Sequence, residues 1–275
     1  MTMLRKRLGR PLPLLLAQLA GILGLVFLLL PTLVVVPISV GPDKYLHFPP
    51  RGFTLDWYRQ LLGDPAWIKP ALFSLKIAVI VAVLSTVLGT MAAYALTRGR
   101  LRGEQVVSLA TLAPIIAPNI VIGVAMYLFF SRLGLSGSLV AFVLAHTVLA
   151  TPYVIITVSA SLVGTDADLD MAAMSLGATR WGAFRHVTLP LIMPGIIAGA
   201  VFAFIVSFDE PVVSFFLSSV RDKTLPRKIF EDLDFDVSPV VAAVSTLLTF
   251  SSIGFLALIG VMKRVGARRG VVSEG

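Results

Sequence analysis

Six long apolar runs dominate this 275-residue sequence. A helix needs about 20 apolar residues to cross the hydrocarbon core of a membrane, and each run reaches that length between flanking charges or Pro and Gly residues. Backbone polar groups in lipid must be paired inside the protein, so we expect an all-α integral membrane protein. The six transmembrane helices are expected at residues 12–38, 67–96, 105–130, 138–162, 191–217 and 239–262.

The composition excludes a water-soluble domain. Hydrophobic residues make up 57% of the chain and charged residues only 14%, with a mean hydropathy of +0.91. A soluble fold of this length could not bury so much apolar surface. The net charge of +8 would suggest nucleic acid binding in a soluble protein, but in a membrane protein it indicates basic loops. Since there is no cysteine and the three histidines are scattered, we expect no metal site. We also expect no cofactor and, because the charge is explained by the loops, no nucleic acid partner.

Basic residues predict the orientation of the spans, because short cytoplasmic loops carry an excess of Lys and Arg. They lie in the head at 1–11, the loop at 98–102 and the tail at 263–275, which six spans place on one side. Both termini are therefore expected in the cytoplasm, and 39–66 forms an outer, periplasmic loop. The first apolar run is too long for a signal peptide, so we expect a retained anchor. The basic residues are Arg5, Lys6, Arg7, Arg10, Arg98, Arg100, Arg102, Lys263, Arg264, Arg268 and Arg269.

The segment at 164–190 is too long for a hairpin and too apolar for a plain linker. Acidic residues in a first turn predict a short helix there, which Gly177 ends. A second amphipathic segment is expected at 179–187, after which Leu189 and Pro190 stop the helix and begin the next span. From periodicity alone, an interfacial helix pair on lipid headgroups is as good an interpretation as a docking loop.

A resemblance to a known family favours the docking loop. AAMSLGA at 172–178, followed at a fixed spacing by Val187 and the pair Leu189–Pro190, resembles the EAA loop of permease subunits of binding-protein-dependent ABC importers. The resemblance implies a cytoplasmic loop that couples the permease to an ATPase. Met171 stands where the family usually has Glu. The implied coupling residues are Asp170, Met171, Ala172, Ala173, Leu176, Gly177, Ala178, Arg180, Phe184, Val187, Leu189 and Pro190.

The resemblance extends over most of the chain. Similarity to the second permease of spermidine/putrescine-type importers covers LGTMAAYALTR at 88–98, APIIAPNIVIG at 113–123, HTVLATPYV at 146–154 and SFDEPVVSFF at 207–216. It implies a type I ABC importer permease fold in a bacterial inner membrane, with a five-helix core at 67–262. The implied partners are a second permease subunit, a cytoplasmic ABC ATPase dimer, a periplasmic substrate-binding protein and membrane lipid.

The expected function is ATP-driven import of a small solute by alternating access. The chain has no phosphate-binding loop of its own, so another subunit must hydrolyse the ATP. The preferred solute is a polyamine such as putrescine or spermidine, and an amino-acid derivative is the alternative. An ion-coupled secondary transporter needs no long docking loop, and no inverted repeat is evident. An intramembrane enzyme is disfavoured, because neither H-E-x-x-H nor G-x-S-x-G occurs.

Two acids, Asp209 and Glu210, lie inside an apolar run, where ionisable groups are costly and mark functional positions. Pro211 should kink the helix and free the carbonyl of Ser207 beside the carboxylates. We expect a position that attracts a cationic solute; the alternatives are pairing with a Lys or Arg, or capping of a broken helix. Asn119 replaces an acid common in polyamine-transport relatives, and tyrosine rings can line a cation path. The expected pathway residues are Asp209, Glu210, Ser207, Asn119 and Tyr153.

Other small or polar residues of the spans are assigned to packing. His146 is expected to be hydrogen-bonded inside the bundle instead of binding a ligand. The outer segment at 223–239 can be either a short surface helix that meets the binding protein or a solvated loop. Glycines inside the spans let helices approach closely. These glycines are Gly89, Gly123, Gly195 and Gly199.

Overall fold

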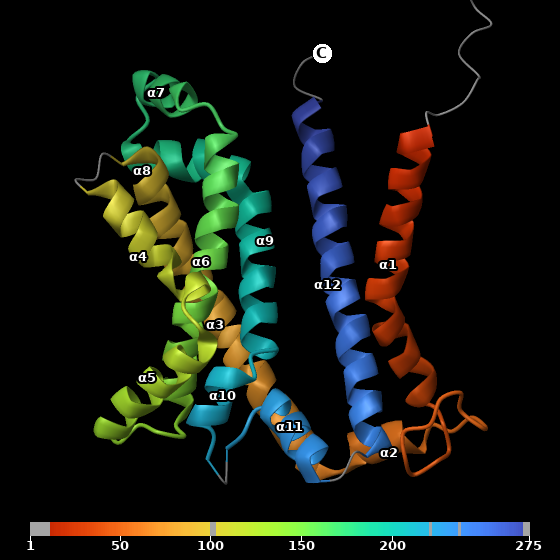
Figure 1. Ribbon diagram of the computed structural model, residues 1–275. Coiled ribbons are helices and arrows are strands. Elements are labelled where there is room, and N and C mark those ends of the chain that lie inside the picture. Colours follow the sequence, from red (N-terminus) through yellow and green to blue (C-terminus); the bar gives the residue numbers. More distant parts are fainter. Residues whose placement is uncertain (1–11, 100–102, 220–221, 236–237, 272–275) are drawn as a thin grey trace, which may run out of the picture. The chain divides into compact units, whose positions relative to one another are not determined.

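The protein is described by a computed structural model that covers residues 12–99, 103–219, 222–235 and 238–271 (Figure 1). Within these ranges all regular structure is helical, as expected for an all-α protein. The basic head, Arg100 and Arg102, and the side chains of the basic tail lie outside the described residues. The helices are α1 (Leu12–Ile38), α2 (Asp56–Gly63), α3 (Pro65–Arg98), α4 (Glu104–Ile116), α5 (Asn119–Arg132), α6 (Leu139–Val163), α7 (Asp168–Ser175), α8 (Arg180–Ala183), η1 (Phe184–Thr188), α9 (Leu189–Phe208), α10 (Val212–Leu217), α11 (Leu225–Phe235) and α12 (Pro239–Val271).

Four described helices are long and apolar enough to cross a membrane, and a sharply bent pair, α4 and α5, makes a fifth span if it is counted as one. The described apolar part of α12 is shorter, so the expected number of six is not matched one for one. The chain is nevertheless a multi-pass membrane protein by the length and hydropathy of these helices. The four spans are Leu16–Ile38, Pro65–Arg98, Leu139–Val163 and Arg180–Phe208.

The chain forms two compact units, Met1–Gly63 with Phe235–Phe250 and Asp64–Asp234 with Ser251–Gly275. In the first unit, the segment after α1 folds back through side-chain hydrogen bonds. The Trp57 indole N–H donates to the carbonyl of Gly41 at 2.7 Å. The hydroxyls of Ser39 and Tyr58 lie 2.7 Å apart. The expected loop at 39–66 therefore contains a short helix, α2, that is tied to the end of α1.

The prediction of one helix at 105–130 was wrong. Two helices, α4 and α5, are bent by 100° at the short break between them. Pro118 has no N–H to donate to the carbonyl of Pro114, and Ala117 before it adopts an extended conformation with ψ 139°. Asn119 is therefore the first residue of α5 and does not lie within a continuous span.

The expected span at 191–217 also differs from the structure at both ends. Leu189 and Pro190 do not stop a helix, since α8, η1 and α9 run on as one span from Arg180 to Phe208. The π-helical turn η1 lies directly before Pro190, and the Leu189 N–H donates there to the carbonyl of Phe184. This widened turn admits the proline without ending the helix. At the other end, the helix is broken after Phe208 and resumes as α10.

The core of the second unit is α6, which packs between α3 and α9 (Figure 1). A Cβ atom placed on Gly89 of α3 would lie 2.6 Å from Cβ of Val154 on α6, and one on Gly199 of α9 would lie 2.7 Å from Oγ1 of Thr157. A Cβ on Gly195 would overlap Ser161 of α6. The packing role predicted for these glycines is confirmed. Gly123 likewise lets α5 approach α10, since its Cβ would lie 2.5 Å from Cδ2 of Phe216.

Candidate functional site

The coupling loop, which we define as 164–190, begins with α7. The Asp166 carboxylate accepts a hydrogen bond from the N–H of Asp168 at 2.9 Å and so orders the entry to the helix. Asp168 and Asp170 lie in the first turn, where negative charge stabilises the helix N-terminus. The short acidic helix predicted for this loop is therefore present.

Gly177 ends α7 in a left-handed conformation, with φ +96°. The Ala178 N–H donates to the carbonyl of Ala173, and the Gly177 N–H donates to that of Met174, both at 3.0 Å. These two bonds form a Schellman motif, in which a residue without Cβ is favoured. Among the described residues, and leaving out its two neighbours in the chain, no atom lies within 4 Å of the place where a Gly177 Cβ would stand. The demand for glycine within this chain thus comes from its backbone, and the space around it is open.

A second short segment, α8, follows immediately. The Thr179 hydroxyl accepts a hydrogen bond from the N–H of Gly182 at 3.0 Å and caps α8. Trp181 stacks on Phe184 with ring centroids 5.4 Å apart, and Phe184 in turn meets the edge of Tyr94 on α3 at 5.2 Å. Phe184 thus packs against the end of α3, and the more exposed ring of Trp181 covers Phe184.

Asp170 faces the loop's own interior. Its Oδ1 accepts a hydrogen bond from the hydroxyl of Thr188, in η1, at 2.5 Å. Met171, which replaces the family's usual Glu, is 56% exposed, and Leu176 is 90% exposed. Asp170 is thus engaged within the chain, while the outer surface of the loop carries apolar side chains where the family has an acid.

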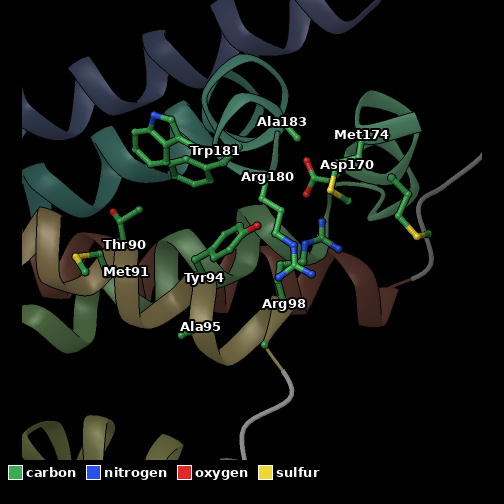
Figure 2. A pocket seen from close by; sticks show the side chains of 13 residues that line it. Thr90, Met91, Tyr94, Ala95, Arg98, Asp170, Met174, Arg180, Trp181 and Ala183 are labelled. Carbon is green, nitrogen blue, oxygen red and sulfur yellow. The ribbon is translucent and has the colours of Figure 1, made fainter. Parts of the chain in front are cut away.

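A pocket of about 980 Å³ opens between the end of α3 and the coupling loop. Figure 2 shows Tyr94 and Arg98 on α3, with Asp170 of α7 and Arg180 of α8 across the pocket from them. Apart from Asp170, the walls carry no acid. The arrangement concentrates positive charge and aromatic surface at the root of the coupling loop.

Arg98 is the residue that fixes this root. Its Nη2 donates to the carbonyls of Leu162 and Thr165, at 3.2 and 2.8 Å, and to the Thr165 hydroxyl at 2.9 Å. A guanidinium at the C-terminal end of α6 complements the helix dipole, and here it adds a donor to the carbonyl of Leu162 and to Thr165, just beyond the helix. Arg98 therefore joins the ends of α3 and α6 to the start of the coupling loop.

The second candidate region is the break between α9 and α10, which we define as Asp209–Pro211. Asp209 and Glu210 do not lie within a helix, so the prediction that they do was wrong. The buried Glu210 caps α10: its Oε1 accepts from the N–H of Val212 at 3.2 Å, and its Oε2 accepts from those of Val213 and Ser214 at 2.8 and 3.1 Å. This is one of the alternatives expected from the sequence. The neighbouring carboxylate of Asp209 is exposed.

His146 of α6 spans this break. Its Nδ1 lies 3.1 Å from the carbonyl oxygen of Ser207 and 3.0 Å from its hydroxyl, and its Nε2 lies 3.3 Å from the hydroxyl of Ser214. The hydrogen-bonded packing role expected for His146 is confirmed. The other two expected pathway residues lie elsewhere: Asn119 is exposed at the start of α5 and Tyr153 is half-buried on α6. No hydrogen bond between described residues joins either of them to the break.

Comparison with known proteins identifies the family of this chain. The family described as "Binding-protein-dependent transport system inner membrane component" matches residues 85–265, from the middle of α3 into α12. The chain belongs to this family. The permease resemblance found in the coupling loop is thereby confirmed, and the chain is a transport component and not an enzyme in itself.

Two curated relatives of this permease are similar over most of its length. The spermidine/putrescine transport system permease protein PotC of Haemophilus influenzae is 34% identical over 84% of this chain and 90% of its own. The putrescine transport system permease protein PotI of Escherichia coli K12 is 34% identical over 86% and 87% of the two chains. The identity lies across the whole core and is not confined to the loop motif.

Solved structures share the fold of the permease. A crystal structure of a bacterial ABC transporter that imports the acidic polysaccharide alginate matches with a TM-score of 0.70 at 17% identity, covering 90% of this chain and 95% of that one. An inward-facing structure of the MetNI methionine ABC transporter matches with a TM-score of 0.58 at 20% identity, covering 73% and 93%. At these identities the matches establish the importer permease fold alone.

Beyond the break, the segment at 223–239 contains the helix α11. In α11, Arg227 pairs with Glu231 at 3.2 Å and Lys228 pairs with Asp232, one helical turn apart. The Arg227 guanidinium lies 3.8 Å from the ring centroid of Phe215 on α10. The N–H of Leu225 donates to the hydroxyl of Ser74 on α3 at 2.8 Å. Of the two interpretations of this segment, the short helix is correct.

Three residues of the permease were missed as positioning residues by sequence reasoning. Arg98 was counted only as an orientation charge, His146 only as packing, and Thr188 was not singled out. Arg98 is the last residue of the segment 88–98, and His146 is the first residue of the segment 146–154. Both segments resemble other permeases, and this resemblance was the signal that could have pointed to the two residues. Among the described residues, no group of three or more His, Cys, Asp or Glu side chains is placed to hold a metal ion.

Proposed function

We propose that this chain is the permease subunit of an ATP-driven importer that moves a polyamine, such as putrescine or spermidine, into the cytoplasm by alternating access. The observation that carries the proposal is the 34% identity to PotC and PotI, which extends over 84% and 86% of the chain. The exposed carboxylate of Asp209, at a break in an apolar helix, supports a cationic solute, since an acid at membrane depth attracts cations.

A smaller amine is the second candidate solute. Asn119 stands where polyamine-transport relatives commonly carry an acid, which reduces the negative charge available for a molecule with several amines. A putative 2-aminoethylphosphonate transport system permease protein, PhnV of Salmonella paratyphi A, is 29% identical over 90% of this chain. An aminoalkyl compound or amino-acid derivative with one amine would suit Asp209, the exposed one of the two acids at the break.

The coupling loop is proposed to dock on a cytoplasmic ATPase dimer. Two observations support this docking. The apolar side chains of Met171, Leu176 and Trp181 are exposed, that of Trp181 by 67%, and the space around Gly177 is open. A short helix with an apolar surface can lie in a groove of a partner protein. Thr188 and Arg98 would carry the movement of α7 into α9, α6 and α3. An interfacial position on lipid headgroups is the competing interpretation of the same apolar surface.

The remaining partners follow from the same proposal. A second permease subunit would complete the pathway, and a periplasmic binding protein would deliver the solute at the side of α11. Both termini and the coupling loop would then face the cytoplasm of a bacterial inner membrane. Because the chain has no cysteine, single cysteines can test this orientation by labelling from each side. Labelling of Leu176→Cys from the outside would contradict it.

Binding of radiolabelled putrescine to the cognate binding protein tests the solute. We expect saturable binding that unlabelled spermidine or putrescine displaces. Competition by 2-aminoethylphosphonate and by amino acids, in the same assay, distinguishes the second candidate. If no polyamine binds and a single-amine compound does, the polyamine proposal is wrong and the second candidate replaces it.

A further inference from the structure

The break Asp209–Pro211 interrupts the run from α9 to α10, and side chains bond to backbone groups on both sides of it. In a continuous helix, the carbonyl of Ser207 would accept a hydrogen bond from residue 211, but Pro211 has no N–H. A buried carbonyl without a partner costs free energy, so another donor must replace the missing one. Ser207 and Glu210 are both buried, so bulk solvent does not reach this carbonyl.

His146 supplies that donor. It is 1% exposed, and its Nδ1 lies 3.1 Å from the Ser207 carbonyl oxygen. We assign the imidazole hydrogen to Nδ1, because this tautomer gives the Ser207 carbonyl a donor and leaves Nε2 as an acceptor; the Ser207 hydroxyl lies 3.0 Å from the same Nδ1. The hydroxyl of Ser214, 3.3 Å away and fully buried, then donates to Nε2. The two nitrogens of one ring thus hold the last turn of α9 and the first turn of α10.

α10 is connected on its other sides as well. Phe216 packs on Gly123 of α5 so closely that a Cβ on the glycine would lie 2.5 Å from the ring. The Arg227 guanidinium of α11 lies over the ring of Phe215. His146 itself is fixed on α6, where the Phe142 ring meets its edge at 6.0 Å. A change in the direction of α10 at the break would therefore disturb its contacts with both α5 and α11.

We infer that His146 is a positioning residue for transport: its bonds to Ser207 and Ser214 fix the direction of α10 at the break and so hold the Asp209 carboxylate in the solute pathway. This inference rests on the proposed function, in which Asp209 meets a cationic solute. A fully satisfied buried polar group specifies one arrangement of the elements it joins, whereas apolar packing alone would allow several. His146 acts here without contacting the solute.

Different substitutions of His146 remove its bond to Ser207, its bond to Ser214, or both. An Asn side chain places its amide near the position of Nδ1, so His146→Asn keeps a donor for Ser207 and loses the contact with Ser214. His146→Gln reaches farther and loses the bond to Ser207, and His146→Phe loses both. Thr147→Val is the matched control, because Thr147 is the adjacent buried residue and its hydroxyl bonds only to Val143 of its own helix.

The test uses the complete transporter with both permeases, the ATPase and the loaded binding protein. The readout is solute taken up per ATP hydrolysed, which a loss of folded complex does not change. We expect this ratio to fall roughly tenfold in His146→Gln and His146→Phe, since a small misplacement of a contact group has effects of this order. His146→Asn and Ser214→Ala should fall less and to similar values, and Thr147→Val should match the parent.

A double-mutant cycle that combines His146→Gln with Asp209→Asn distinguishes positioning of Asp209 by His146 from a general structural role of His146. If His146 acts through Asp209, His146→Gln lowers the ratio no further in the Asp209→Asn background. Equal losses in both backgrounds, an unchanged ratio in His146→Phe, or a loss in Thr147→Val would overturn the inference.

Hydrogen exchange of the peptide 209–217 needs no solute and therefore distinguishes failure of this inference from failure of the proposed function. We expect faster exchange in His146→Gln than in Thr147→Val. Equal exchange in the two variants would overturn the inference even if the solute is not a polyamine.

Discussion

The hydroxyl of Thr188 donates a 2.5 Å hydrogen bond to Oδ1 of Asp170, across 18 positions of sequence, and joins α7 to the π-helical turn that leads into α9. Thr188 is buried, and η1 continues directly into α9. A displacement of α7 by a docked partner would therefore pull on the start of a transmembrane helix. This bond gives the coupling loop a direct connection to the membrane core.

Replacement of Thr188 by Val should weaken this connection with little change of volume. Loss of one hydrogen bond to a partly exposed carboxylate costs about 1 kcal/mol, so the complex should still assemble. Solute uptake per ATP hydrolysed should decrease in the reconstituted transporter. Ser175→Ala is the control, because the Ser175 hydroxyl bonds only to the Met171 carbonyl of its own helix. Equal ratios in the two variants would show that the Thr188–Asp170 bond carries no coupling.

Replacement of Gly177 by Leu should leave the fold intact and uncouple ATP hydrolysis from uptake. The left-handed backbone costs a non-glycine residue about 1–2 kcal/mol, and the space around it is open within this chain, so the side chain would meet the docked partner. The measurement is solute-stimulated ATPase activity together with uptake. Gly164→Leu is the control, since Gly164 has an ordinary φ of −75°. Normal uptake and stimulation in Gly177→Leu would contradict the docking role.

Replacement of Arg98 by Ala should lower the melting temperature of the complex. The guanidinium serves three acceptors at the end of α6, and its loss should cost about 1–2 kcal/mol. Arg98→Lys should recover only part of this stability, because the Lys side chain is one bond shorter than the path to Nη2, the nitrogen that makes all three bonds, and its ammonium reaches fewer of the acceptors. Arg185→Ala, at an exposed position of the same loop region, provides the comparison. A melting temperature equal to that of Arg185→Ala would refute the anchoring role of Arg98.

The adjacent acids Asp209 and Glu210 should respond differently to loss of charge. Glu210→Gln weakens the cap of α10 and should reduce stability by about 1 kcal/mol, with uptake per assembled complex largely kept. Asp209→Asn should leave assembly unchanged and reduce uptake of a cation roughly tenfold, which corresponds to about 1.4 kcal/mol. Assembly by size-exclusion chromatography and uptake of labelled putrescine are measured on both variants. If Asp209→Asn and Glu210→Gln change assembly and uptake in the same way, Asp209 has a structural role.

The all-helical fold and some of its spans could be predicted from the sequence, because they depend on local hydropathy. The bounds of α3 and α6 differ from prediction by no more than two residues. Pro211 was expected to disturb its helix, and it does. Pro118 and Pro190 were both misjudged, since one bends the chain by 100° while the other continues within a helix beyond a π-helical turn. Whether a proline breaks a helix or continues within it depends on tertiary packing, which the sequence around the proline does not reveal.

The contacts that organise the candidate sites were not predictable. Arg98 reaches Thr165 over 67 positions, and His146 reaches Ser214 over 68. Such pairs are set by the packing of α6 between α3 and α9, and no local pattern specifies them. Glu210 illustrates the middle case: a carboxylate before Pro211 can cap a helix, but the sequence equally allowed a solute contact or an ion pair.

The most direct test of the account is ATP-driven uptake of labelled putrescine into proteoliposomes that contain this chain with its second permease and ATPase. The account predicts accumulation that requires both ATP and the loaded binding protein, and that Gly177→Leu abolishes while Gly164→Leu does not. Accumulation that proceeds without ATP and follows an ion gradient would contradict the account.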